Sequence, residues 1–163
     1  MRLEIELIPE STWHISLANL LSRPIWDTLR REVYSKASYI CEICYATDCR
    51  VNCHEVWAWN DKTSVQTLKK LVCLCDDCHY IIHWGGTVQQ VHEGKLSGDT
   101  LGRLTDHFCK VNKCTKKDFE RYKVLIGNRQ QKRAGKKYKV DFGKFHPDRV
   151  TEIWVQENKG KRL

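Results

Sequence analysis

The spacing of four cysteines constrains this sequence more than any other feature. Cys41 and Cys44 form one Cys-x-x-Cys pair, Cys75 and Cys78 form a second, and 30 residues lie between the pairs. Each pair brings two thiolates to one side of a tight turn, so the two turns supply the four soft, anionic ligands that Zn²⁺ binds tetrahedrally. The pattern predicts a structural zinc whose binding is coupled to folding of the surrounding segment.

Other uses of the cysteines fit less well. A thioredoxin-like redox pair needs a single Cys-x-x-Cys and leaves the second without a role. A disulfide framework is not expected, because the nine cysteines are odd in number and the chain starts with no apolar stretch of signal-peptide length. Cys73 and Cys109 are expected to be small buried hydrophobes. Cys49 and Cys53 leave a second metal site open as an alternative.

The charge of the chain is concentrated in its last third. Residues 1–109 hold 11 Lys and Arg against 14 Asp and Glu, a net charge of −3, whereas residues 110–163 hold 17 against 6, a net charge of +11. Such asymmetry is typical of a surface that binds nucleic acid, and a solvated basic tail is the alternative. The candidate phosphate contacts are Arg129, Lys132, Arg133, Lys136, Lys137 and Lys139.

Hydrophobic periodicity predicts an α+β chain without an apolar run long enough to cross a membrane. Alternating residues predict strands, and apolar stripes three or four residues apart predict helices. Strands are expected at 3–7, 138–142 and 150–155, with a hairpin-like region around 51–59 and a polar loop at 60–64. Helices are expected at 17–21, 22–36, 76–83, 101–111 and 115–126, with a loop at 85–98.

Three histidines stand close to the cysteine pairs. His79 follows Cys78 directly and His83 comes four residues later, so on a helix both imidazoles project from the same face. His54, followed by Glu55, precedes the second pair in an extended segment. Imidazoles one helical turn apart can bind a divalent metal together, so this constellation predicts a second site that binds a metal or carries out catalysis.

With these motifs in place, the sequence resembles the HNH endonucleases of the ββα-metal fold, in particular the small zinc-knuckle type of bacteria and phages. The matching segments are Cys41-x-x-Cys44, Cys53-His-Glu-Val-Trp57 and Leu71-x-x-Leu-Cys-x-x-Cys-His-x-x-x-His83, preceded by the helix around Trp26–Tyr34. The resemblance implies an HNH-like core at 38–96, N-terminal elements at 1–37 that pack on it, and a basic extension at 97–163.

The resemblance also implies a function: metal-dependent hydrolysis of DNA phosphodiester bonds in the cytoplasm of a bacterial or phage-infected cell. His79 and His83 would bind Mg²⁺ or another divalent metal, His54 would act as the general base, and the four cysteines would hold the structural zinc. In an alternative alignment with the family motif, His54 is a metal ligand and Glu55 is the residue on the side of the general base. The alternative function is an inactive HNH-like zinc module that binds nucleic acid or protein.

Two positions depart from the family pattern. The family usually has Asp or His immediately before the base, where this chain has Cys53. The middle Asn of the motif falls near Lys70, where the sequence has no Asn, so Asn60 and Gln66 are the candidates for its role.

Overall fold

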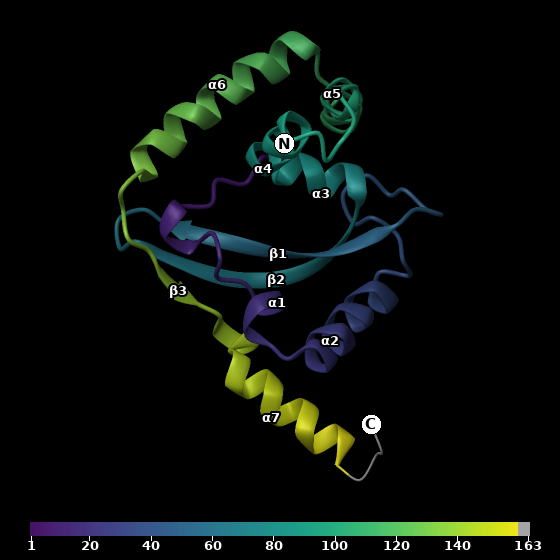
Figure 1. Cartoon of the computed structure of the whole chain (residues 1–163), viewed down its shortest axis with the longest axis vertical. Coiled ribbons are helices and arrows are strands. Elements are labelled where there is room, and N and C mark those ends of the chain that lie inside the picture. Colours follow the sequence, from purple (N-terminus) through teal and green to yellow (C-terminus); the bar gives the residue numbers. More distant parts are fainter. Residues whose placement is uncertain (160–163) are drawn as a thin grey trace.

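The fold was determined as a computed structural model, which describes residues 1–159 (Figure 1). It is α+β, as the sequence predicts. The helices are α1 (Leu17–Leu20), α2 (Arg23–Lys36), α3 (Asp76–Ile82), α4 (Trp84–His92), α5 (Thr100–Asn112), α6 (Lys116–Arg133) and α7 (Pro147–Asn158), with 3-10 turns η1 (Glu10–Thr12) and η2 (Gly143–Phe145). The strands are β1 (Val51–Asn60), β2 (Val65–Cys75) and β3 (Lys139–Asp141).

A long hairpin forms the centre of the fold. β1 and β2 pair antiparallel from Val51 opposite Cys75 to Asn60 opposite Val65. Asn60 closes the turn, because its Oδ1 accepts the N–H groups of Lys62 and Thr63 at 3.1 Å. β3 adds to β2 in parallel, so the C-terminal third of the sequence contributes a strand to the central sheet.

The sheet lies between two helical layers, each with its own core (Figure 1). Alternate strand residues point to opposite faces, and the irregularity opposite Val56 and Trp57, where Lys69 of β2 has no partner in the register, reverses the alternation between Leu68 and Lys70. Val72 and Leu74 of β2 pack with α3, α5 and α6 on one face, in a core that includes Ile81, Leu104, Phe108 and Phe119. Leu68 packs on the other face with α1, α2 and η2, in a core that includes Leu17, Ile25 and Phe142. No helix in residues 1–159 combines the length and the apolar character that crossing a bilayer requires.

Most of the expected helices are confirmed. The proline in Ser22-Arg-Pro24 lies in the first turn of α2, where its missing N–H costs nothing. Thr115 and Asp118 form the capping box that starts α6. Leu104 and Phe108, from the apolar stripe on α5, are fully buried.

Three local expectations are wrong. Residues 3–7 are not a strand of the sheet. Residues 85–98 are not all loop, because α3 ends at Ile82 and α4 restarts at Trp84 with both glycines, Gly85 and Gly86, in its first turn. The expected strand at 150–155 is part of α7, which Pro147 begins and whose Val150 and Trp154, four residues apart, pack into the second core.

The segment 2–8, here named the N-terminal strap, is held by side chains instead of a neighbouring strand. Four residues of α5 and α6 bind its backbone, and each lies more than 100 positions later in the sequence. Asn112 binds Arg2 and Leu3, Tyr122 accepts from the N–H of Ile5, Arg133 donates to the carbonyl of Leu7, and Gln130 donates to the carbonyl of Ile8. The alternation of apolar residues in a strand does not predict hydrogen bonds from such distant side chains.

Asn112 makes the largest share of these bonds, so its removal is a direct test of the strap. Its Oδ1 accepts from Arg2 and Leu3 at 2.9 and 3.1 Å, and its Nδ2 donates to the Leu3 carbonyl at 2.9 Å. Asn112→Ala is expected to lower the free energy of unfolding by about 1–3 kcal/mol, because it leaves half-buried backbone groups unpaired. Urea denaturation measures the change. Asn128→Ala, at an exposed site on α6, is the control, and an equal effect there would refute the assignment.

Candidate metal centres

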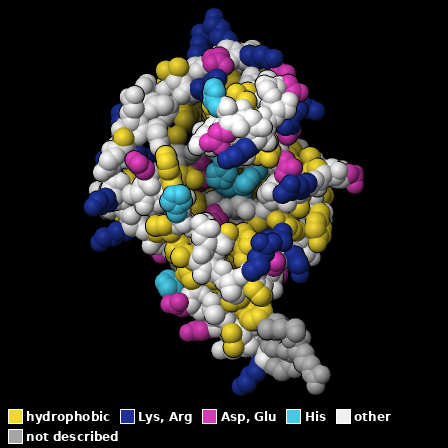
Figure 2. Space-filling model, viewed as in Figure 1, with side chains coloured by type: hydrophobic (Ala, Val, Ile, Leu, Met, Phe, Trp, Pro, Cys, Tyr) yellow, Lys and Arg dark blue, Asp and Glu magenta, His cyan; other side chains and the backbone are white. Residues whose placement is uncertain are grey.

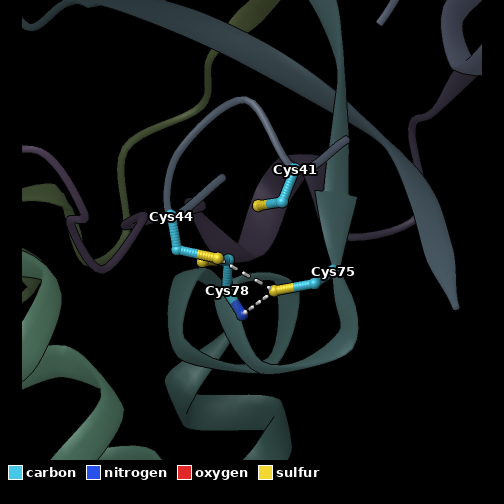
Figure 3. A group of neighbouring side chains, drawn as sticks. All are labelled: Cys41, Cys44, Cys75 and Cys78. Atoms are coloured by element: carbon cyan, nitrogen blue, oxygen red, sulfur yellow. Dashed lines mark hydrogen bonds between the residues drawn. The ribbon is translucent and has the colours of Figure 1, made fainter. Parts of the chain in front are cut away.

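The four cysteines of the two pairs converge on one point (Figure 3). Cys41 and Cys44 lie in the loop before β1, Cys75 ends β2, and Cys78 lies in the first turn of α3. Their sulfur atoms are all within 4.8 Å of one another, with Cys44 Sγ and Cys75 Sγ 3.5 Å apart. Four thiolates of one tetrahedral zinc lie about 3.8 Å apart, given Zn–S bonds of about 2.3 Å. The cluster can therefore hold a metal ion such as zinc.

The thiols of this cluster influence one another's ionisation. Hydrogen bonds with Cys75 and Cys78 lower the pKa of Cys41. The hydrogen bond with Cys41 in turn raises the pKa of Cys75 to about 12. Without a metal, one thiolate makes the next unfavourable in this buried space, and a bound cation removes that penalty.

A histidine that no motif in the sequence indicated borders the cysteine cluster. His107 of α5 has its Nε2 3.3 Å from Cys78 Sγ. Its other ring nitrogen, Nδ1, is 3.9 Å from Asp77, which also pairs with Arg103. An imidazole N–H beside a thiolate orients that ligand. His107 lies 29 residues after Cys78 on a separate helix, so no short-range spacing in the sequence predicts the contact.

The structure also brings together His54, His79 and His83. Their ligand atoms lie within 4.8 Å of one another, and the ring centroids of His79 and His83 are 4.7 Å apart. His54 lies on β1, His79 lies within α3 and His83 caps that helix. His54 is 5% exposed, whereas the other two are half-buried. The expected helical juxtaposition of His79 and His83 is confirmed, and His54 joins them from the sheet.

All three imidazoles are held in the neutral form, which is the form that binds metals. Burial lowers the pKa of His54 to about 2, with further lowering from His83 and His79. Burial also lowers the pKa of His83 to about 4 and shifts the pKa of His79 in the same direction. At neutral pH the site thus presents nitrogen lone pairs and not positive charge.

Two carboxylates lie next to the histidines. Glu55 follows His54 on β1, and its Oε1 accepts the Leu17 N–H at 2.7 Å, at the start of α1. Glu6, from the N-terminal strap, has its Oε2 3.7 Å from His54 Nε2. Burial raises the pKa of Glu6 to about 8, with a further contribution from the charge of Glu55, and burial raises the pKa of Glu55 to about 7. Glu55 was a candidate from the sequence, and Glu6 was not.

The histidines and both carboxylates line one small cavity of about 200 Å³, which also contains Gln66. Gln66 is 1% exposed, and its Oε1 has no hydrogen-bond partner within residues 1–159. Gln66 thus lies at the site, whereas Asn60 is occupied in the hairpin turn. Figure 2 shows histidine side chains at the bottom of a hollow in the middle of this face.

Cys53, the residue before His54 on β1, is bound through its backbone to α2. Its backbone N–H donates to the Tyr34 hydroxyl at 3.1 Å. Burial raises the pKa of its thiol to about 12, so the side chain stays protonated. Within residues 1–159 it belongs to neither of the two groups that could hold a metal.

A larger hollow of about 470 Å³ runs from His54 toward α6. Basic side chains from distant parts of the sequence line it, together with Glu4, Glu6 and Glu42. These basic residues are Arg2, Lys70, Arg129 and Arg133. A groove with several cations beside the histidines is a suitable path for a phosphate backbone.

The basic run at 129–139 divides into two kinds of residue. Five of its members are exposed, namely Arg129, Lys132, Lys136, Lys137 and Lys139. Arg133 is different. Its guanidinium donates to both oxygens of Asp61 at 2.9 and 3.3 Å, donates to the carbonyl of Leu7, and lies over the Trp59 ring. Arg133 therefore fastens α6 to the hairpin turn and the strap.

Comparison of the chain with family models, with curated proteins and with solved structures found no match. The function must therefore be inferred from the site itself.

Proposed function

We propose that this protein is a metal-dependent DNA endonuclease of the HNH type, with a structural zinc on Cys41, Cys44, Cys75 and Cys78. The observation that carries the proposal is the convergence of His54, His79 and His83 within 4.8 Å of one another. All three belong to the hairpin and helix that the four-cysteine cluster joins. A hairpin strand and a helix that meet at neutral imidazoles beside a basic groove suit the hydrolysis of a phosphodiester bond.

In this proposal the three histidines hold one divalent metal, Mg²⁺ or a transition metal. The sequence leaves two assignments of His54 open, and the one that makes it a metal ligand is better supported. A ring nitrogen of His54 lies within 4.8 Å of the ligand atoms of His79 and His83, as a shared ion requires. Three protein ligands leave a position open, as in catalytic metal sites. When bound, such a metal activates water and stabilises the charge that develops on the phosphate.

The remaining residues of the site position the substrate. The cavity beside the histidines is small, and Gln66 offers a buried amide at its wall. Lys70 and Arg129 line the adjoining hollow, where they can contact phosphates on either side of the bond to be cut. The expected product is a nicked or linearised DNA whose formation depends on metal.

Plasmid cleavage tests the function. The purified full chain is incubated with supercoiled plasmid in EDTA and then with Mg²⁺, Mn²⁺ or Ni²⁺. We expect cleavage with at least one metal and none in EDTA. If the protein binds DNA but cleaves it with none of these metals, the proposal is contradicted and the inactive zinc module is favoured. His54→Ala separates the two assignments of His54: loss of metal binding supports a ligand, whereas retained metal binding with lost cleavage supports a general base.

The basic run provides an independent prediction about DNA binding. Replacing Lys132, Lys136 and Lys137 together by Gln is expected to weaken binding to duplex DNA. The slope of log affinity against log salt should fall by about 0.9 for each phosphate that the variant no longer neutralises. Fluorescence anisotropy at several salt concentrations measures both the affinity and the slope.

The matched control removes three positive charges at the opposite end of α6. Lys110, Lys113 and Lys117 are exposed and lie at or near the junction of α5 and α6. A helix of the length of α6 separates the two groups by about 27 Å, at 1.5 Å per residue. An equal loss of affinity in both triple variants would show that net charge, and not this surface, binds the DNA.

A further inference from the structure

The carboxylate of Glu6 is buried without a partner for one of its oxygens. The Glu6 side chain is 11% exposed. Its Oε2 has no hydrogen-bond donor anywhere in residues 1–159. Buried carboxylate oxygens are nearly always paired, because an unpaired one loses its hydration without replacement. An unpaired oxygen in a folded protein therefore points to a group that binds there.

The unpaired oxygen faces the histidine site. Glu6 Oε2 is 3.7 Å from His54 Nε2, which is too long for a hydrogen bond. Two neighbouring ligands of one ion, each about 2.1 Å from it, lie about 3.0 Å apart in octahedral geometry and about 3.4 Å apart in tetrahedral geometry. Glu6 also lines the same small cavity as His54, His79 and His83. The separation and the shared cavity fit an oxygen and a nitrogen that bind the same cation.

The backbone around Glu6 is fixed in place from both sides. Its own N–H donates to the carbonyl of Ile82 at 2.9 Å, one residue before His83. The residues on either side of it, Ile5 and Leu7, are bound by Tyr122 and Arg133. The strap is thereby bound directly to the end of the helix that contains His79 and is capped by His83, which holds Glu6 beside the histidines.

The electrostatics of the site favour a cation together with this carboxylate. Three neutral imidazoles supply no charge to balance a divalent ion. Glu55 lies on the same cavity, but one of its oxygens already accepts from Leu17 at 2.7 Å. Glu6 has an oxygen without a hydrogen-bond partner 3.7 Å from His54 Nε2, and its carboxyl supplies the negative charge when a bound cation displaces the proton.

We propose that Glu6 is the anionic ligand of the histidine site, so that the cation is bound by three imidazoles from the hairpin and helix and by one carboxylate from the N-terminal strap. This inference rests on the proposed function, because it concerns the same metal. It adds a residue that lies outside the segment carrying the HNH-like motif. These four ligands leave two positions of a six-coordinate Mg²⁺ or Mn²⁺ ion open for water and phosphate. It also makes the strap part of the site and not only a cover over the core.

Binding of Mn²⁺ to the zinc-loaded full chain tests the assignment without relying on cleavage. Mn²⁺ suits nitrogen and oxygen ligands and competes poorly for four thiolates, so the cysteine cluster keeps its zinc. Free Mn²⁺ is followed by electron paramagnetic resonance in wild type, Glu6→Gln, Glu6→Asp and His79→Ala. Glu4→Gln is the matched control, since Glu4 is exposed on the same strap. Circular dichroism and zinc content confirm that each variant is folded.

We expect Glu6→Gln to weaken Mn²⁺ binding about 10- to 100-fold, Glu6→Asp to weaken it less, and Glu4→Gln to leave it unchanged. His79→Ala should abolish it. If His79→Ala binds Mn²⁺ like wild type, the histidine site of the proposed function is wrong. If His79→Ala loses Mn²⁺ while both Glu6 variants bind it as wild type does, the histidine site stands and the role of Glu6 is refuted.

Discussion

Cys41→Ser is expected to unfold the zinc-bound core. Cys41 is fully buried, and its sulfur is one of four within 4.8 Å of one another. Zinc binding contributes about 10–16 kcal/mol to the folding of small zinc domains, whereas whole domains are stable by about 5–15 kcal/mol. Because the cluster joins the loop before β1 to the start of α3, its loss removes the connection on which the histidine site depends.

Zinc content and thermal unfolding measure this result. Wild type should carry one tightly held zinc per chain, and Cys41→Ser should carry almost none and show no cooperative melting transition. Cys49→Ser is the matched control, because Cys49 lies in the same loop, is exposed and is outside the cluster. A zinc-free Cys41→Ser protein with the wild-type melting temperature would contradict the structural role of the metal.

His79→Ala is expected to abolish cleavage while the fold remains. The imidazole lies beside His83, with ring centroids 4.7 Å apart, and is half-buried at the cavity, so its removal costs little packing. Loss of a metal ligand removes both the activated water and the charge stabilisation, which is a loss on the order of 10³-fold or more in the rate. Zinc in the cysteine cluster should be unaffected.

Initial rates of plasmid nicking at saturating metal measure the effect. His92→Ala, an exposed histidine on α4, is the control for the loss of an imidazole elsewhere. The prediction fails if His79→Ala cuts at the wild-type rate, or if His92→Ala loses as much activity.

Spacing in the sequence was sufficient to predict the four-cysteine cluster and the pair His79 and His83, because both depend on short-range geometry. Cys-x-x-Cys brings its thiols together within one turn, and residues four apart share a helix face. The addition of His54 depended on the hairpin of β1 and β2. The sequence predicted its polar loop at 60–64, but it placed the hairpin-like region at 51–59, which is one strand, and indicated no strand at 65–75. These parts of the site are local in the chain.

Glu6 and His107 could not be predicted in this way. Glu6 reaches the site from a segment whose alternating residues indicated a strand, yet whose hydrogen bonds come from side chains of α5 and α6. His107 reaches Cys78 from α5, 29 residues away. Arg133 was a candidate phosphate contact because its run of sequence contains no acid, and Asp61, which binds it, lies 72 residues earlier. Tertiary contacts of this length leave no periodic pattern in the sequence.

The strap has a consequence for the order in which the molecule is made. Three of the four side chains that hold residues 2–8 belong to α6 and leave the ribosome more than 110 residues after them. Such long-range contacts close late in folding. A nascent chain that ends before Lys116 contains the four clustered cysteines and the three histidines, yet it lacks the α6 side chains that bind the strap on both sides of Glu6. Full anchoring of this carboxylate thus waits for synthesis of α6.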